Sequence, residues 1–145
     1  MEELMYEMNP WWEASPKADG IFRENYLDLF KKNLNNRDVI FVTGLRRVGK
    51  TTIMYQLIQK LMDTNVDKTA ILFFSFDEVS VKLSEILEKY KEIYNKNFRK
   101  DKIYIFLDEI QKYSGWENEL KKYYDLYVHT IYTYLIPEIH HHPPS

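Results

Sequence analysis

Residues 44–51 read Gly-Leu-Arg-Arg-Val-Gly-Lys-Thr, a stretch that fits the phosphate-binding pattern G-x-x-x-x-G-K-[ST] without a mismatch. The apolar run Val39–Val42 comes just before it, and apolar residues at helical spacing come after it. The sequence therefore predicts a strand, a glycine-bounded loop and a helix that begins at the loop. In such a loop the backbone N–H groups surround a phosphate, and the positive end of the helix dipole favours its negative charge.

The positions of this loop differ in the chemistry that they offer. Gly44 and Gly49 allow backbone angles and a close approach that a Cβ atom would block. Lys50 is placed to reach the β- and γ-phosphates, and the hydroxyl of Thr51 is a ligand for Mg²⁺. The residues expected to surround the nucleotide are Gly44, Leu45, Arg46, Arg47, Val48, Gly49, Lys50, Thr51 and Thr52.

A second apolar run, Ile103–Leu107, ends in two acidic residues, Asp108 and Glu109. Because the carboxyl ends of parallel strands meet at one edge of a sheet, we expect both carboxylates to lie beside the phosphate-binding loop. There Asp108 would hold Mg²⁺, in part through water, and Glu109 would polarise the attacking water. Lys50 and Glu109 are thus the candidate catalytic residues. The candidate metal ligands are Thr51 and Asp108.

The composition narrows the class of protein. The chain has 145 residues, enough for one domain, and 45% of them are hydrophobic and 16% aromatic, which is ample for a core. It contains no cysteine, so disulfides, thiol nucleophiles and cysteine-bound metals are excluded. A net charge of −2 does not indicate a general polyanion binder, and no apolar stretch has membrane-spanning length. We expect a cytoplasmic protein that does not contact a membrane.

The remaining elements follow from prolines and from apolar spacing. Residues 1–20 are expected to form an irregular lead-in, because Pro10 and Pro16 interrupt a helix. The pair Trp11-Trp12 either packs on the domain or forms a wall near a bound base. Ser114 and Glu117 have the spacing of a capping box. The spacing predicts a strand over residues 70–76 and helices over 21–34, from about 50 to 62, over 79–95 and from 116 onward.

The loop with its paired arginines, the run Leu-Asp-Glu-Ile-Gln at residues 107–111 and Trp116 together resemble the AAA-type P-loop ATPases that are common in archaea. The resemblance covers roughly residues 21–127. It implies an α/β fold of the additional-strand P-loop type, in which helices flank both faces of a parallel sheet. It also implies ATP rather than GTP as the nucleotide, with Mg²⁺ as cofactor and the candidate residues in the roles given above.

The resemblance is less specific about partners. It is compatible with a homo-oligomer or a partner protein, and for the full-length family with nucleic acid, which the net charge of this chain does not support. Arg46 and Arg47 leave several interpretations open. Their guanidinium groups either contact the nucleotide, a partner subunit or nucleic acid, or face water at the tip of the loop.

The chain departs from that family after Tyr127, where a strand ending in a polar sensor residue is expected. The β-branched and aromatic residues of the segment 128–136 suit a strand, and Thr130 or Thr133 is the candidate sensor. No arginine follows Arg99, although family members usually carry arginines in their C-terminal parts.

We therefore expect a truncated member of the family. Its core would span residues 21–136 and be incomplete at the C-terminus, and residues 137–145 would form a disordered tail. The three consecutive histidines at 140–142 could bind a metal, but without further ligands in view a simple tail is the favoured interpretation.

Three functions agree with these patterns. The first is an Mg²⁺-dependent ATPase, which Glu109 supports, because a simple nucleotide kinase would not need a glutamate there. The second is a non-hydrolytic ATP-binding or interaction module, which the missing C-terminal arginines favour. The third, a GTPase or small-molecule kinase, is weaker, because the segment Asn95-Lys96-Asn97 lacks the aspartate of the guanine-specifying pattern Asn-Lys-x-Asp.

Overall fold

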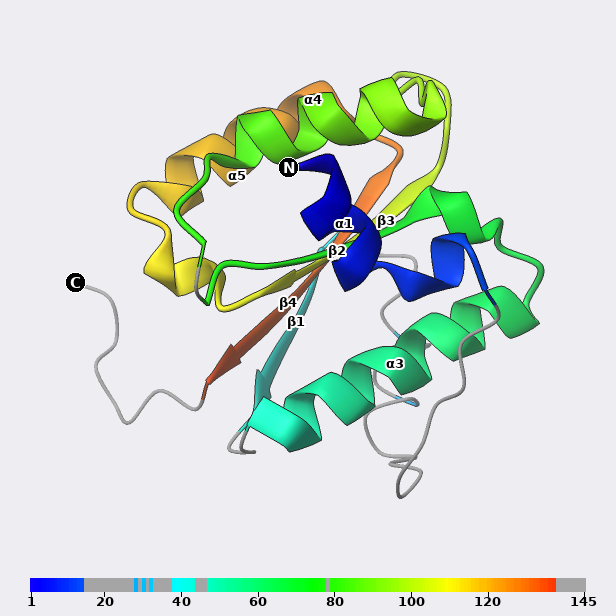
Figure 1. Ribbon diagram of the computed structural model, residues 1–145. Helices are drawn as coiled ribbons and strands as arrows, with labels where there is room; N and C mark the ends of the chain where they lie inside the picture. The colour runs from blue at the N-terminus through cyan, green and yellow to red at the C-terminus, as the bar shows by residue number, and fades with distance from the viewer. Residues whose placement is uncertain are drawn as a thin grey trace.

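The computed structural model describes residues 1–14, 28, 30, 32, 38–43, 47–77 and 79–137, with their side chains except for 38–52 and 135–137. Four strands with helices around them make up this part of the chain (Figure 1). The strands are β1 (Asp38–Thr43), β2 (Ile71–Ser75), β3 (Ile103–Asp108) and β4 (Thr130–Pro137). The α-helices are α1 (Glu2–Met8), α3 (Arg47–Asp63), α4 (Leu83–Tyr94) and α5 (Trp116–Leu126). The 3-10 helices are η1 (Pro10–Trp12), η2 (Lys68–Ala70) and η3 (Ile110–Lys112).

The strands are all parallel and lie in the order β1-β4-β3-β2. The last strand in the sequence, β4, is inserted between β1 and β3: Tyr134 pairs with Ile40 on one side and with Leu107 on the other. This confirms the predicted α/β fold with a parallel sheet. It also confirms the additional strand, which separates the strand before the phosphate-binding loop from the strand that ends in Asp108.

Helices cover both faces of this sheet, as expected. In Figure 1, α3 lies on one face, and α4 and α5 lie on the other. Because both faces are covered, β2 and β3 consist almost wholly of buried apolar residues instead of an alternating pattern. The apolar stripe predicted for α3 faces the core, with exposed fractions of 2% or less at Ile53, Met54, Leu57, Ile58 and Leu61.

The N-terminal segment is more regular than the prolines indicated. It contains α1 and η1, and Pro10 stands at the first turn of η1, where its missing N–H group costs nothing. Trp11 and Trp12 are buried, and the indole N–H groups of both donate to the backbone oxygen of Ile71, at 3.1 and 2.8 Å. Of the two interpretations of the tryptophan pair, packing on the domain is therefore confirmed.

Two helix starts differ from the prediction. α4 begins at Leu83, not at residue 79, because the backbone of Lys82 is still extended (φ −85°, ψ 147°). The predicted capping box of Ser114 and Glu117 is wrong: Gly115 precedes α5 with a φ of +80°, and no side chain caps that helix. The left-handed angle at the glycine ends the preceding loop and sets the start of α5 one residue later than a serine cap would.

The helix predicted over residues 21–34 lies largely outside the described residues. Of its positions, Asp28, Phe30 and Lys32 are described, and they are helical. Phe30 is fully buried, with its ring 6.0 Å from that of Phe106 in β3. In the part of the chain that the structure describes, no helix is long and apolar enough to cross a membrane.

Candidate functional site

The carboxyl ends of β1 and β3 form the centre of the candidate site. β1 ends at Thr43 and α3 begins at Arg47, so a strand and a helix flank the loop as predicted. Gly44, Leu45 and Arg46 lie outside the described residues. For the loop residues from Arg47 to Thr52 only the helical backbone is described. The contacts predicted for the side chains of Lys50 and Thr51 therefore stay predictions.

The strand register places Asp108 at the same edge of the sheet as this loop. Asp108 pairs with Leu135 of β4, and Leu135 pairs in turn with Phe41 of β1, two residues before Thr43. Neighbouring strands lie about 4.8 Å apart, so β1 and β3 are separated by about 10 Å across β4.

The carboxylate of Asp108 lies beside a second polar residue that ends a strand. The hydroxyl of Ser75 at the end of β2 donates to Asp108 Oδ2, with 3.4 Å between the oxygens. The next residue, Phe76, donates its backbone N–H to the Asp108 carbonyl at 2.9 Å, so the chains after β2 and β3 remain joined beyond the sheet. Ser75 was not predicted as a site residue, although it is the one polar residue of the apolar run 70–76.

The donor atoms at this edge fit Mg²⁺. A carboxylate and a hydroxyl offer hard oxygen ligands, which this cation prefers over nitrogen or sulfur. Among the described residues no three His, Cys, Asp or Glu side chains come together as a metal site. Mg²⁺ does not need such a cluster, because it is usually held by one or two protein ligands together with phosphate oxygens and water.

Glu109 follows directly and has an unusual backbone. Its φ and ψ are 57° and 33°, the left-handed region that few residues other than glycine adopt. A conformation of this kind costs of order 1–3 kcal/mol and often occurs where function requires it. The turn directs the chain out of β3 into η3, whose residue Ile110 is 1% exposed and anchored in the core. The carboxylate oxygen Oε2 of Glu109 accepts a hydrogen bond of 2.6 Å from the side-chain amide of Gln111.

The register of β4 corrects the sensor prediction. Thr130 pairs with Ile103, the first residue of β3, and therefore lies at the far end of the sheet from Asp108. Thr133 pairs with Phe106, two residues short of the edge, and is 1% exposed inside the sheet. Leu135, Ile136 and Pro137 are the β4 residues at the level of the loop and of Asp108. Neither threonine reaches that level, because β4 continues beyond both of them to Pro137.

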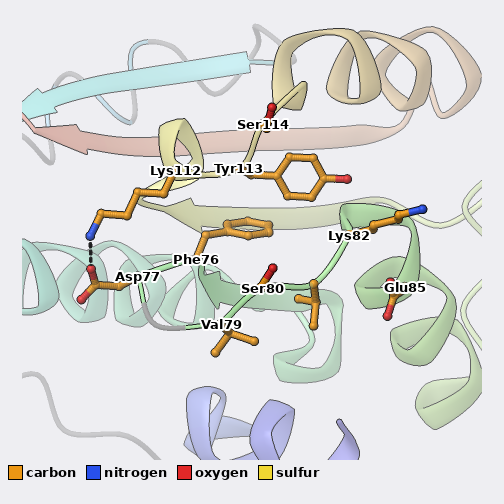
Figure 2. A pocket seen from close by; sticks show the side chains of 10 residues that line it. Phe76, Asp77, Val79, Ser80, Lys82, Glu85, Lys112, Tyr113 and Ser114 are labelled. Carbon is orange, nitrogen blue, oxygen red and sulfur yellow. Dashed lines mark hydrogen bonds and ion pairs between the residues drawn. The ribbon is translucent and has the colours of Figure 1, made fainter.

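A cavity of about 680 Å³ lies next to these loops (Figure 2). Its walls come from residues 76, 77 and 79–82 after β2, from Glu85 of α4, and from residues 112–114 at the end of η3 and just after it. The ammonium group of Lys112 points to the carboxylate of Asp77, and the two form an ion pair between the two loops. The ring of Tyr113 packs edge to face on that of Phe76, with 5.4 Å between centroids.

Burial governs the ionisation of Tyr113 at this cavity. Removal from water raises the pKa of its phenol, and the hydrogen bond that the hydroxyl donates to the Glu119 carboxylate raises the pKa further. The Asp77–Lys112 pair could not be predicted from the sequence, because the two residues lie far apart in the chain and belong to no motif. The histidines at 140–142 lie outside the described residues.

Comparison with known proteins finds relatives that are uncharacterised. An uncharacterised protein of Methanocaldococcus jannaschii is 36% identical over 94 residues, which cover 63% of this chain and 20% of that protein. An uncharacterised protein of Haemophilus influenzae is 25% identical over 99 residues, or 67% of this chain and 25% of that protein. The chain thus matches only a fifth to a quarter of the length of these relatives. No solved structure matches it.

A sequence profile gives the family. Residues 36–135 match the profile of a family described as AAA domain, and this match includes most of β4, so the family likeness continues past Tyr127. The matched region contains β1, the phosphate-binding loop, and the strand that carries Asp108. Because the match covers more than half of the chain, the protein belongs to the AAA domain family of nucleotide-binding P-loop proteins.

Proposed function

We propose that this chain binds ATP with Mg²⁺ at the edge between β1 and β3 and hydrolyses the γ-phosphate. The observation that carries the proposal is the parallel register of β1, β4 and β3, in which β1, the strand before the phosphate-binding loop, ends at the same edge of the sheet as β3, which ends in Asp108. Membership of the AAA domain family supports a nucleotide as the ligand. The choice of ATP and of hydrolysis rests on the motifs at residues 44–52 and 107–111.

Each residue has a separate part in this proposal. The backbone of the loop and the ammonium group of Lys50 bind the β- and γ-phosphates, while Thr51 and Asp108 would hold Mg²⁺. The cation would neutralise charge on the phosphate oxygens as the reaction proceeds. Ser75 keeps the Asp108 carboxylate at the edge of the sheet through the hydrogen bond described above.

Glu109 supplies the acid–base chemistry. Its carboxylate accepts a hydrogen bond from a water in line with the γ-phosphate. The water oxygen forms a bond to phosphorus while the bond from phosphorus to the β,γ-bridging oxygen breaks, and ADP leaves with that electron pair. The water proton passes to Glu109 and then to the released phosphate. In this mechanism the loop amides and Lys50 supply the electrostatic part of the catalysis by stabilising the charge that develops on the phosphate oxygens.

A second candidate is an ATP-binding module that does not turn over. One observation favours it: the chain spans only a fifth to a quarter of the length of the relatives that it matches, and P-loop ATPases commonly use an arginine, in some cases supplied by another protein, to stabilise the transition state. In that case binding would be intact, but release of phosphate would require an arginine from another segment or subunit.

The experiment is calorimetric titration of the full chain with ATP and Mg²⁺, followed by phosphate release in the same samples. Lys50→Ala should weaken binding by about tenfold or more, because a charge-assisted contact to phosphate is lost. Glu109→Gln should bind normally and slow release by about 10²- to 10⁴-fold, the usual contribution of a general base. Binding by the parent chain without release would favour the second candidate, and equal binding by Lys50→Ala would refute both.

A further inference from the structure

Gln111 ends the Asp-Glu-Ile-Gln run and has no role in the function proposed so far. Its side-chain amide Nε2 donates to Glu109 Oε2 at 2.6 Å, a short contact for a nitrogen donor, and the acceptor is a carboxylate, which strengthens such bonds. Glu109 forms the turn between β3 and η3, and Gln111 is the middle residue of η3. The contact therefore joins an unassigned residue to the group that would activate water.

The turn that carries both side chains is held in place at several points. Its backbone is closed by hydrogen bonds from Lys112 N to Glu109 O (3.1 Å) and from Tyr113 N to Ile110 O (2.9 Å). Ile110 is buried in the core, and Lys112 is ion-paired with Asp77 on the neighbouring loop. Because the backbone is fixed on both sides of Gln111, the amide can reach Glu109 at little cost in conformational entropy.

A general base needs an orienting group. A carboxylate has two oxygens, and a side chain that rotates freely spends little time with either of them in line with the reacting phosphorus. A donor on one oxygen fixes the plane of the group, so that the other oxygen presents its lone pair in one direction. This is the relation of base to orienting partner that is found in many active sites.

We propose that Gln111 is a positioning residue for Glu109: its amide holds Oε2, and Oε1 thereby accepts the proton of the attacking water. The inference rests on the proposed ATPase function and deepens it. Gln111 acts through Glu109 and does not touch the nucleotide. Its loss therefore lowers kcat and leaves the binding of ATP unchanged.

A restraining role for Gln111 would change kcat in the opposite direction. If the amide restrained Glu109 in an inactive position, removing Gln111 would release the base and raise the rate of hydrolysis. The left-handed backbone of Glu109 favours positioning over restraint, because the turn already fixes where the side chain begins. The two roles are separated by the direction of the change in kcat.

The test compares Gln111→Ala and Gln111→Asn with Gln59→Ala in the full chain. Gln59 is the matched control, because its amide also donates to a carboxylate, Asp63 Oδ1 at 3.0 Å, in an exposed contact like that of Gln111, but both residues of this pair belong to α3. We expect Gln111→Ala to lower kcat about tenfold, the effect of losing one hydrogen bond to a charged group. KM and the dissociation constant for ATP should stay within about twofold, and Gln111→Asn, which keeps the amide, should restore part of kcat. Gln59→Ala should match the parent. An unchanged or higher kcat in Gln111→Ala would overturn the proposal.

A second measurement does not need turnover. In ¹H–¹⁵N spectra of the full chain without nucleotide, the side-chain amide signals of Gln111 should shift when Glu109 is replaced by Ala, and those of Gln59 should not. Signals of Gln111 that do not move would overturn the positioning contact even in an active enzyme. A shift in a chain that releases no phosphate would support the contact and place the failure in the proposed hydrolysis.

Discussion

The side chain of Asn9 forms with Phe73 the pair of hydrogen bonds that a neighbouring strand would form. Asn9 Oδ1 accepts from the backbone N–H of Phe73 at 2.6 Å, and Asn9 Nδ2 donates to the Phe73 carbonyl at 3.0 Å. Phe73 lies in β2, the last strand on its side of the sheet that the structure describes. Exposed strand edges promote pairing between chains. The fully buried Asn9 prevents such pairing at Phe73, because its amide group occupies both backbone hydrogen-bonding groups of that residue.

Replacing Asn9 should destabilise the fold strongly. Asn9→Ala removes both bonds to Phe73 and a third, of 2.7 Å, to the Met5 carbonyl. We expect a loss of about 2–3 kcal/mol in the free energy of unfolding, because buried backbone groups lose their partners. Asn9→Asp is the informative companion, because it keeps the acceptor for the Phe73 N–H but places a carboxylate against the Phe73 carbonyl. Urea titration measures both variants, and a change below about 0.5 kcal/mol in Asn9→Ala would contradict the bridging role.

The two tryptophans share one acceptor on the same strand, so their effects should not add. The indoles of Trp11 and Trp12 both donate to the carbonyl of Ile71. Replacing either tryptophan by Phe removes one donor and leaves the other. We expect the lost hydrogen bond to lower the free energy of unfolding by about 1 kcal/mol. The double variant leaves that carbonyl without either indole, and we expect its cost to exceed the sum of the single costs by about 1 kcal/mol. Strict additivity in urea unfolding would show that the carbonyl finds water instead.

Tyr90 predicts a loss of stability in alkali. Its side chain is fully buried and its hydroxyl donates to the Thr69 carbonyl. Burial, and next the negative charge of Asp67, raise the pKa of the phenol above the ordinary value near 10. The folded state therefore retains a proton that the unfolded state releases. The stabilisation is complete below pH 10 and declines above it, by up to about 1.4 kcal/mol per pH unit.

The variant Tyr90→Phe isolates this group. It should cost about 1 kcal/mol at neutral pH, because the hydrogen bond to Thr69 is lost. Between pH 10 and 11.5 its stability should fall less steeply than that of the parent, since one titrating phenol is gone. Parallel curves of unfolding free energy against pH would assign the alkaline loss to other tyrosines.

Thr130 should tolerate a change that a sensor residue would not. Its side chain is fully buried at the N-terminal end of β4, and among the described residues its hydroxyl oxygen has no hydrogen-bond partner. Thr130→Val replaces that hydroxyl by a methyl group of similar size. We expect the free energy of unfolding to rise by up to about 1 kcal/mol, because a buried polar group without a partner is removed. The rate of phosphate release should stay within about twofold of the parent rate. A tenfold loss would show that Thr130 contributes to the site after all.

The sequence was informative wherever burial alone shapes the pattern. The apolar runs of β2 and β3 and the stripe that begins at Ile53 predicted strands and a helix correctly, because each depends only on which face is covered. The acidic pair at 108–109 could be placed at the loop, since parallel strands end at a common edge. The order of the strands could not be read from these patterns. It followed from resemblance to a family.

The features that could not be predicted from the sequence depend on the backbone at a single glycine or on contacts between distant residues. Asn9 and Phe73 are separated by most of the first half of the chain, and no local pattern marks an asparagine that closes a sheet edge. Glu117 follows Ser114 at capping spacing, but the local turn was set by the positive φ of Gly115 instead. Thr130 could be excluded as a sensor only from the register of β4, which depends on its partners on both sides.

The ion pair of Asp77 and Lys112 connects the loop after β2 with the turn that carries Glu109, so breaking it should affect turnover more than stability. The carboxylate side chain is 15% exposed and the lysine side chain 49%, and such a half-buried pair is worth about 1 kcal/mol. Asp77→Asn and Lys112→Met should each loosen the turn and lower kcat several-fold while ATP binding stays unchanged.

A double-mutant cycle measures the coupling of this pair in urea unfolding. The exposed pair Lys121 and Asp125 on α5, at 3.2 Å and with side chains 76% and 61% exposed, provides the matched control. We expect a coupling of about 1 kcal/mol for the first pair and of about 0.3–0.5 kcal/mol for the control. Hydrogen exchange at the Tyr113 amide, which closes the turn, should accelerate in Asp77→Asn. If kcat falls while that amide stays protected, the ion pair acts on the reaction by a route other than the Glu109 turn.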